Sequence, residues 1–456
     1  MKKQEKNQGK NLNKNIILPN NAKGITLITL VVTIIVLIIL VGISISLILG
    51  DNGIVKKAKQ AKEQTEQSRI NEEMNFNETI KYIEDLGIGE GKTNSPDTIK
   101  KVEEVKGGDY FNKPTTIKDS DGNYIKVPEG FKVAGDSGKN VTEGIVIEDN
   151  DIIEGVGNNR GNQYVWIPVG NGIKKSDGTS INITLGRYTF ADGTNDKDSN
   201  GAILAKGTPI LKQSAENYTQ EVIINSYFKE LATYREGVAS DGEDGLNTTS
   251  RGKQKADGTY EGIKSFIDSV KANGGYYIAR YEASYGIDGK ANSKVSNTFT
   301  NSNTAPTTRT EGMLWNHITQ INAATASRDL YTTATTDLIN SYAWDTAIVY
   351  IQNFSGDTDY SYRVGKSINS SLTNTGANKD EVCKINDMAS NDVEYTTEYS
   401  TEKSDSIAAP CTMRGGMYNF DELYTSYRYS DSVVALEDTG ESYTTQAYTF
   451  RLTLYM

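Results

Sequence analysis

The chain is poor in the residue types that most catalytic metal centres require. Its 456 residues include one histidine, His317, and two cysteines, Cys383 and Cys411. One histidine cannot supply a two- or three-histidine metal site, and two cysteines cannot hold an iron–sulfur cluster or a four-cysteine zinc ion. A Ser–His–Asp triad would have to use His317, and the sequence around it does not have the form of a nucleophile elbow.

Basic residues are also outnumbered by acidic residues. The chain has 48 Lys and Arg against 59 Asp and Glu, which gives a formal net charge of −11. Phosphate contacts need a concentrated basic face, so we expect no nucleic-acid partner. Accidental carboxylate pairs are certain among so many acidic residues, and composition therefore does not decide whether a glycosidase-type pair exists.

Glycine and tyrosine are abundant. There are 42 glycines, and 27 tyrosines stand against 10 phenylalanines and 3 tryptophans, while hydrophobic residues make up 36% of the chain. This composition predicts a loop-rich protein that favours β-structure, and it argues against a helical bundle or a multi-span transporter.

The first 49 residues divide into a basic leader and an apolar run. Residues 1–24 contain six lysines and one glutamate, and residues 25–49 contain no charged side chain. A helix over 25–49 is long enough for a hydrocarbon core of about 30 Å. The basic leader predicts a cytoplasmic N-terminus, a single pass through the cell membrane and an extracellular C-terminal region.

The junction between leader and apolar run resembles the class III signal of type IV prepilins. The leader ends in Lys23-Gly24, and the apolar run begins directly with Ile25. In that family a prepilin peptidase cleaves after the glycine, and the new N-terminus is usually methylated. The resemblance therefore implies cleavage between Gly24 and Ile25, methylation of Ile25, and other pilin-like subunits as partners.

One position departs from the pilin pattern. The family usually has glutamate at the fifth mature position, where this chain has Thr29. In filaments that carboxylate is thought to pair with the terminal amine of a neighbouring subunit, and an unpaired carboxylate is costly inside a bilayer. Thr29 therefore favours a minor or tip pilin, or a simple anchor, over the bulk subunit of a fibre.

Two segments separate the apolar run from the rest of the chain. Residues 50–86 are charged, with apolar residues loosely at helical spacing, and predict an extended helix or a stalk. Residues 87–107 begin with a glycine-rich stretch and predict a linker.

Residues 108–456 predict one large α+β domain, because short apolar runs alternate with clusters of Gly, Asn, Asp and Ser. We expect strands at 124–127, 144–147, 164–169 and 276–282, and helices at 216–236, 260–273, 321–331 and 340–353. Residues 171–258 are mostly polar and predict an insertion with irregular loops. The apolar face of the 260–273 helix consists of Ile263, Phe266, Ile267 and Val270.

Six motifs in this domain stand in a characteristic order. They are YVWIP at 164–168, GYYIARYEA at 275–283, YAWDTA at 342–347, DMASNDVEYT at 387–396, MRGG at 413–416 and FRL at 450–452. Together they resemble the formylglycine-generating-enzyme (sulfatase-modifying-factor) family, whose fold is a variant of the C-type-lectin-like fold. The resemblance covers about residues 125–456 and implies a loop-rich C-type-lectin-like domain. Trp166, Trp344 and Tyr281 are expected to pack in its core.

The catalytic residues of the resembled enzymes are missing. The formylglycine-forming members have a cysteine pair just after Arg-Gly-Gly, and residues 417–432 contain no cysteine. The non-haem iron members need three histidines. We therefore expect a protein without enzymatic activity, and a divergent enzyme of the sulfatase-modifying-factor type is the alternative.

The resemblance also implies a calcium site. The family's Asn-x-x-Gly-Asn-x-x-Glu loop matches residues 387–394 of this chain. If the family's ligands are placed on the matching residues of this chain, Asp387 and Glu394 would supply side-chain oxygens, and Ser390 and Asp392 would supply backbone carbonyls. The alternative is a loop that is stabilised by its own hydrogen bonds.

The two cysteines lie in the part of the chain that is expected outside the cell. An oxidising compartment favours a disulfide between Cys383 and Cys411. The alternative is two separate buried thiols.

Aromatic and small polar residues crowd the segment after Arg-Gly-Gly, and its aromatic members are Tyr418, Phe420, Tyr424, Tyr427 and Tyr429. Tyrosine with serine and asparagine is typical of adaptable recognition loops. In the diversity-generating-retroelement branch of this fold, the same region is a hypervariable ligand face. These residues therefore predict a face for an extracellular protein or glycan, and the alternative is that they only pack the domain.

The leading hypothesis is a pilin-like, membrane-anchored surface protein that displays a lectin-like domain for adhesion. One alternative is a structural subunit of a pilus or of a pseudopilus like that of type II secretion. The other is the divergent enzyme.

Overall fold

The computed structural model describes residues 99–217, 221–223, 229–231, 262–300, 306–318, 320–368, 370–377, 380–400, 411–431 and 448–456. They belong to one compact unit that begins at Thr98. The predicted leader, transmembrane helix and stalk, including Gly24 and Ile25, lie outside the described residues. Within the described ranges, no helix combines the length and the apolar character that crossing a bilayer requires.

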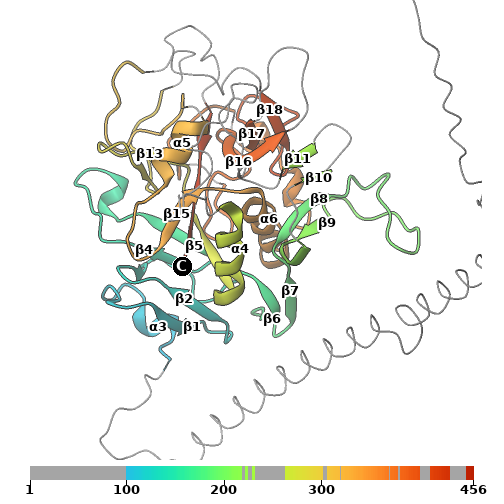
Figure 1. Cartoon of the computed structure of the whole chain (residues 1–456), viewed down its shortest axis with the longest axis horizontal. Coiled ribbons are helices and arrows are strands. Elements are labelled where there is room, and N and C mark those ends of the chain that lie inside the picture. The colour runs from blue at the N-terminus through green and yellow to red at the C-terminus, as the bar shows by residue number, and fades with distance from the viewer. Residues whose placement is uncertain are drawn as a thin grey trace, which may run out of the picture. The chain divides into compact units, whose positions relative to one another are not determined.

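The described unit is built mostly of strands, with few helices (Figure 1). Its central sheet is antiparallel and has the order β15 (Thr335–Leu338), β20 (Leu452–Tyr455), β12 (Gly275–Ala279), β5 (Gln163–Pro168), β4 (Val146–Glu148) and β3 (Lys132–Val133). Every residue of β5 and β12 is buried, which is why both strands read as continuous apolar and aromatic runs.

A second sheet contains the segments that flank the Arg-Gly-Gly motif. Its order is β10 (Glu221–Ile223), β11 (Lys229–Leu231), β16 (Glu394–Ser400), β17 (Cys411–Arg414) and β18 (Arg428–Asp431), and β19 (Thr449–Phe450) pairs with β16 in parallel. In Figure 1 this sheet lies at the opposite end of the unit from α3 and β1.

Four two-stranded hairpins complete the β-structure. They are β1–β2 (Thr115–Lys118 and Tyr124–Val127), β6–β7 (Gly170–Lys174 and Ser180–Ile183), β8–β9 (Gly186–Phe190 and Pro209–Ser214) and β13–β14 (Ser284–Tyr285 and Ala291–Asn292). The described α-helices are α3 (Val102–Val105), α4 (Gly262–Asn273), α5 (Gln320–Ser327), α6 (Ser341–Ser355) and α7 (Gly365–Ile368), with 3-10 turns η1 (Gly157–Asn159), η2 (Ala215–Asn217) and η4 (Tyr360–Tyr362).

Helix α6 is the buried helix of the unit. Each residue from Ser341 to Gln352 is buried, and the helix packs against β5 and β8. Asn340 caps its N-terminus by accepting a hydrogen bond from the Ala343 amide at 2.9 Å, and Gly356 ends it in the left-handed conformation. The Tyr276 hydroxyl donates to the Ala343 carbonyl at 2.6 Å, and the Tyr350 hydroxyl donates to the Val141 carbonyl at 2.6 Å.

Helix α4 packs on β12 and β20 through the predicted apolar face. The four residues of this apolar face, Ile263, Phe266, Ile267 and Val270, are all buried. The Phe266 ring packs edge-on against Tyr276 and Tyr455, with centroid distances of 5.2 and 5.4 Å. The core positions predicted for Trp166, Trp344 and Tyr281 are confirmed, since all three side chains are buried.

Six predicted elements are confirmed. Their ends agree with the predicted ends within one to three residues, except that α5 ends four residues before the predicted end. The strands at 124–127, 144–147 and 164–169 correspond to β2, β4 and β5, and the helices at 260–273, 321–331 and 340–353 correspond to α4, α5 and α6. The strand predicted at 276–282 ends at Ala279, because Arg280 and Glu282 turn into buried polar clusters.

Three predictions were wrong. Residues 170–214 form the hairpins β6–β7 and β8–β9, where irregular loops were expected. The described part of the predicted 216–236 helix contains η2 and the strands β10 and β11. The predicted linker at 87–107 ends early, because α3 buries Val102 and the Gly107 amide bonds to the Val133 carbonyl at 2.9 Å.

Arg451 connects the two sheets. It stands between β19, in the second sheet, and β20, in the central sheet. Its guanidinium is fully buried and donates to both oxygens of Glu394 on β16, with Nη2 2.6 Å from Oε1 and Nε 2.9 Å from Oε2. The remaining donors reach the carbonyls of Ala279 at 3.0 Å and Asn386 at 2.8 Å. One side chain therefore joins β12, β16 and the loop before β16.

We predict that Arg451→Met lowers the free energy of unfolding by about 3–5 kcal/mol, because the Glu394 carboxylate stays buried without its counter-charge. The deficit should shrink at lower pH, where Glu394 is protonated in the variant. Urea unfolding followed by circular dichroism measures both effects.

The double variant Arg451→Met/Glu394→Gln should recover a large part of the loss, since the Glu394 charge is then removed together with its partner. Lys264→Ala removes an exposed pair with Asp268 and serves as the control, with a change within about 0.5 kcal/mol. Equal losses in the single and double Arg451 variants would contradict the coupling.

Candidate functional site

The Arg-Gly-Gly motif marks the point where β17 ends beside the predicted ligand face. Arg414 is the last residue of β17 and is fully buried. Gly415 has a φ of +96°, which side-chain-bearing residues rarely adopt. Gly416 passes so close to the Ala389 carbonyl and to Gly365 that a Cβ would collide with both. The motif therefore combines one buried charge with two backbone positions that require glycine.

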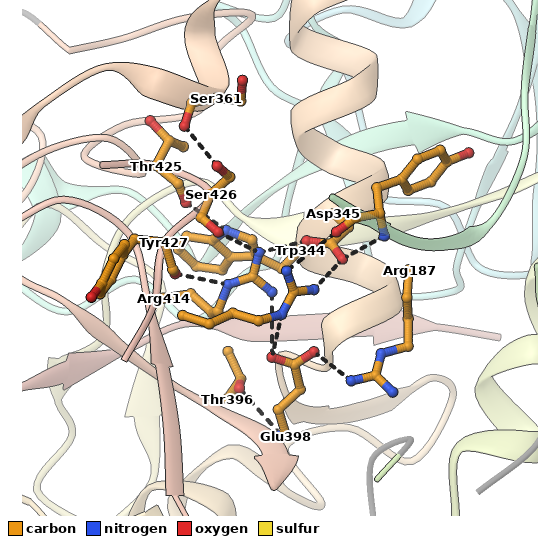
Figure 2. A network of polar contacts seen from close by, with 12 residues as sticks. Arg187, Trp344, Asp345, Ser361, Thr396, Glu398, Arg414, Thr425, Ser426 and Tyr427 are labelled. Atoms are coloured by element: carbon orange, nitrogen blue, oxygen red, sulfur yellow. Dashed lines mark hydrogen bonds and ion pairs between the residues drawn. The ribbon is translucent and has the colours of Figure 1, made fainter. Parts of the chain in front are cut away.

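Asp345 on α6 is the centre of a buried ion-pair network (Figure 2). Its two carboxylate oxygens lie 2.5 Å from Arg414 Nη2 and 2.5 Å from Arg428 Nη2. The Tyr188 amide donates to the same carboxylate at 2.8 Å. A helix, the insertion hairpin β8–β9 and the strands β17 and β18 thus meet at one side chain.

Glu398 on β16 is the second carboxylate of this network. It lies 3.2 Å from Arg187 and 3.4 Å from Arg414, and the side chains of all three residues are fully buried. Ion pairs at this depth hold their partners rigidly, because separating any pair leaves an uncompensated charge in the interior.

The network and its neighbours fix the chain between residues 424 and 428. Arg414 Nε donates to the Tyr427 carbonyl at 3.1 Å, and the Trp344 indole donates to the Thr425 carbonyl at 3.0 Å. The Ser426 hydroxyl donates to the Ser361 carbonyl at 2.9 Å. This segment also runs antiparallel to residues 361–364, with an isolated bridge between Tyr424 and Val364.

Three half-buried tyrosines lie on this fixed segment and its neighbour. The Tyr424 ring stacks on Tyr362 with centroids 4.8 Å apart, and it meets Tyr427 edge-on at 5.2 Å. The Lys206 ammonium lies over the Tyr362 ring at 4.8 Å. We call Tyr362, Tyr424 and Tyr427 the tyrosine face.

The structure brings together only part of the predicted ligand face. Tyr424 and Tyr427 are neighbours, whereas Tyr429 packs edge-on against Tyr448 with centroids 6.5 Å apart. Tyr418 is half-buried against the core, and Phe420 is 45% exposed.

Sequence reasoning missed Tyr362, which follows α6 in the turn η4. Its hydroxyl donates to the Phe190 carbonyl at 2.8 Å. No periodic pattern marks it, because it is placed by the packing of η4 against the β8–β9 hairpin.

The predicted calcium ligands do not fit a calcium ion in this structure. Both Glu394 oxygens accept from Arg451, and Asp387 Oδ2 accepts from the Thr375 hydroxyl at 2.8 Å and from the Gly376 amide at 2.6 Å. The Arg451 guanidinium thus takes both of the side-chain oxygens that Glu394 would offer to calcium. Among the described residues, no group of three or more His, Cys, Asp or Glu side chains is arranged to hold a metal ion.

The carboxylates around Arg451 titrate abnormally. Burial raises the pKa of Glu282 well above its usual range, and the charges of Asp387 and Glu394 raise it further. Burial, together with the charge of Asp387, raises the pKa of Asp380 to about 7. The cluster thus holds more carboxylate groups than its buried arginine can neutralise.

Cys383 is a free cysteine in the structure, and its Sγ lies 3.6 Å from the Thr142 carbonyl. The side chain of Cys411 lies outside the described residues. The predicted bridge between the two is therefore not seen at Cys383, and it stays a prediction. Burial raises the pKa of the Cys383 thiol to about 12.

Comparison of the chain with models of protein families, with curated proteins and with solved structures finds no match.

We predict that iodoacetamide alkylates the Cys383 thiol more slowly in the folded protein than in the unfolded protein. At pH 8 the two rates should differ by about a hundredfold or more. The reason is that a thiol with a raised pKa carries little reactive thiolate at that pH. Counting labels by mass spectrometry after unfolding without reductant also tests the bridge. Two labels mean two thiols, and none means a disulfide. Fast labelling of Cys383 in the folded state would contradict the raised pKa of its thiol.

Proposed function

We propose that the protein is a pilin-like, membrane-anchored surface protein whose extracellular domain binds a ligand and catalyses no reaction. Its ligand is an extracellular protein or glycan. The proposal depends on two independent features: the Lys23-Gly24-Ile25 junction before an uncharged 25-residue run, and the tyrosine face on the large domain.

The tyrosine face is the single observation that supports the binding role most directly. Tyrosine rings offer a large contact area at low conformational cost, and such contact is strongest where the rings are held in place before binding. Here the backbone of residues 425–427 is hydrogen-bonded to Arg414, Trp344 and Ser361. A preorganised aromatic surface of this kind is typical of a recognition site.

We propose a C-type-lectin-like fold of the sulfatase-modifying-factor type for the domain. The order of the six motifs supports this fold, and so do the structural roles of two of them. Arg414-Gly415-Gly416 builds the ion-pair network, and Arg451 of the Phe-Arg-Leu motif joins the two sheets.

We predict that Tyr424→Ala/Tyr427→Ala lowers affinity at least about tenfold for whichever probe binds the unchanged chain, because truncation removes the centre of the contact. The probes are immobilised glycans and extracellular-matrix proteins, measured by surface plasmon resonance. Tyr124→Ala is the matched control, since Tyr124 is 51% exposed on the hairpin β1–β2 and belongs to another surface.

Circular dichroism should show that the double variant keeps its fold, because both side chains are only half-buried. Undiminished binding by a folded double variant would refute the assignment of this face.

The anchor is tested at the N-terminus. Terminal sequencing and intact mass of the protein from the membrane fraction should give a first residue of Ile25, methylated on its amine. That result places the protein in a pilin-type assembly system. A protein that begins with Met1 would be a simple anchored protein, and the prepilin part of the proposal would fail.

A further inference from the structure

Lys294 lies in a slot that the loop after β4 forms around it. The residue follows β14, and its side chain is 0% exposed. The stem packs across Gly157, where a Cβ would stand 2.8 Å from Lys294 Cβ. Gly157, Asn158 and Asn159 all have positive φ values, of 58°, 56° and 58°. This run of left-handed residues bends the loop around the lysine.

The Lys294 ammonium is poorly compensated for a buried charge. Its Nζ lies 2.8 Å from Asp151 Oδ2, and within the described ranges this carboxylate is its single polar partner. An ammonium carries three N–H donors. The Asp151 side chain is 54% exposed, so the negative partner stays hydrated while the positive one is buried. A buried charge with one partner is costly.

The side chains of Lys294 and Asp151 are both held in place by their surroundings. Asn162 Nδ2 donates to Asp151 Oδ2 at 3.3 Å and to Asp149 Oδ2 at 2.9 Å, and Asp149 also accepts the Asp151 amide at 3.0 Å. The side-chain oxygen Oδ1 of Asn162 accepts a hydrogen bond at 2.8 Å from the amide of Ser293, the residue directly before Lys294. The amine and the carboxyl are therefore positioned by the same asparagine.

We propose that Lys294 and Asp151 form an intramolecular isopeptide bond. One ammonium proton first passes to the Asp151 carboxylate, and the neutral Lys294 Nζ then attacks Asp151 Cγ. The bond from Cγ to Oδ1 breaks. Two of the three ammonium protons leave with Oδ1 as water, so the atoms and charges balance without any co-reactant. Oδ2 becomes the amide oxygen and keeps the Asn162 donor, which also stabilises negative charge on it during the attack. Fixed proximity lowers the barrier to this attack.

The bond would remove both charges and two of the three buried N–H donors. It would also join residues 143 positions apart in the sequence. The closed segment contains β5, both hairpins of the insertion, α4 and β12.

Intact-mass spectrometry of the reduced full chain tests the proposal. The expected mass lies about 18 Da below that calculated from the sequence and the observed N-terminus, which corresponds to one water. Tryptic digestion should give a branched peptide that contains Lys294 and Asp151, with no cleavage after Lys294. A full sequence mass for the unchanged protein overturns the proposal.

Two variants separate this bond from other dehydrations, such as a succinimide at an Asp-Gly pair. Lys294→Arg keeps the positive charge and should show the full sequence mass. Asp151→Asn should lose about 17 Da, because ammonia replaces water as the leaving group. A loss of about 18 Da that persists in Lys294→Arg assigns the dehydration elsewhere and overturns the proposal. The test uses no ligand, so it is independent of the proposed function.

Discussion

A single buried guanidinium, that of Arg451, fixes how the two sheets meet. It binds Glu394 on β16, the Ala279 carbonyl at the end of β12, and the Asn386 carbonyl in the intervening loop. Glu394 and Glu398 both lie on β16, so the strand that Arg451 holds also carries the second carboxylate of the ion-pair network. The position of the tyrosine face therefore depends on this contact through β16, β17 and Arg414.

Several of the described arginines of this acidic chain lie in the interior. Arg187, Arg414 and Arg451 are fully buried, and each faces a carboxylate on β16 or α6. A planar guanidinium can bind a carboxylate and several carbonyls at once, which a lysine ammonium cannot do with the same geometry. Loops with little regular structure are thus held by directional contacts, where a helical protein would use continuous apolar packing. We therefore expect the unit to tolerate substitutions poorly at these few positions.

The sequence indicated the regular elements well and the site only in part. The α4 face and the strand β5 were visible because burial on a helix or a central strand leaves a clear apolar pattern. The hairpins β6–β7 and β8–β9 were missed because β6, β7 and β9 are partly exposed and rich in polar residues, and the buried β8 contains glycine, arginine and threonine beside its aromatic residues. Tyr424 and Tyr427 stood out through local composition, whereas Tyr362 joins them only by tertiary packing.

Charged contacts were the hardest to predict. The residues Asp345, Glu398 and Arg428 lie in different elements, and nothing in their local sequence pairs them. The 387–394 segment has the residue types of a calcium site, but its Glu394 binds Arg451, which lies between β19 and β20 and is distant in the sequence. Composition shows which ligands a loop offers, and the fold decides which cation reaches them.

The central place of β20 has a consequence for folding. β20 lies between β15 and β12, and β19, two residues earlier, pairs with β16. A chain that leaves the ribosome or a translocon from its N-terminus cannot complete either sheet until residues 449–455 have emerged. Contacts of such long sequence separation form slowly, and the incomplete sheets expose unpaired edges in the meantime. Neither sheet can therefore close before these last strands emerge, and the chain is most open to proteases and to chaperones during this interval.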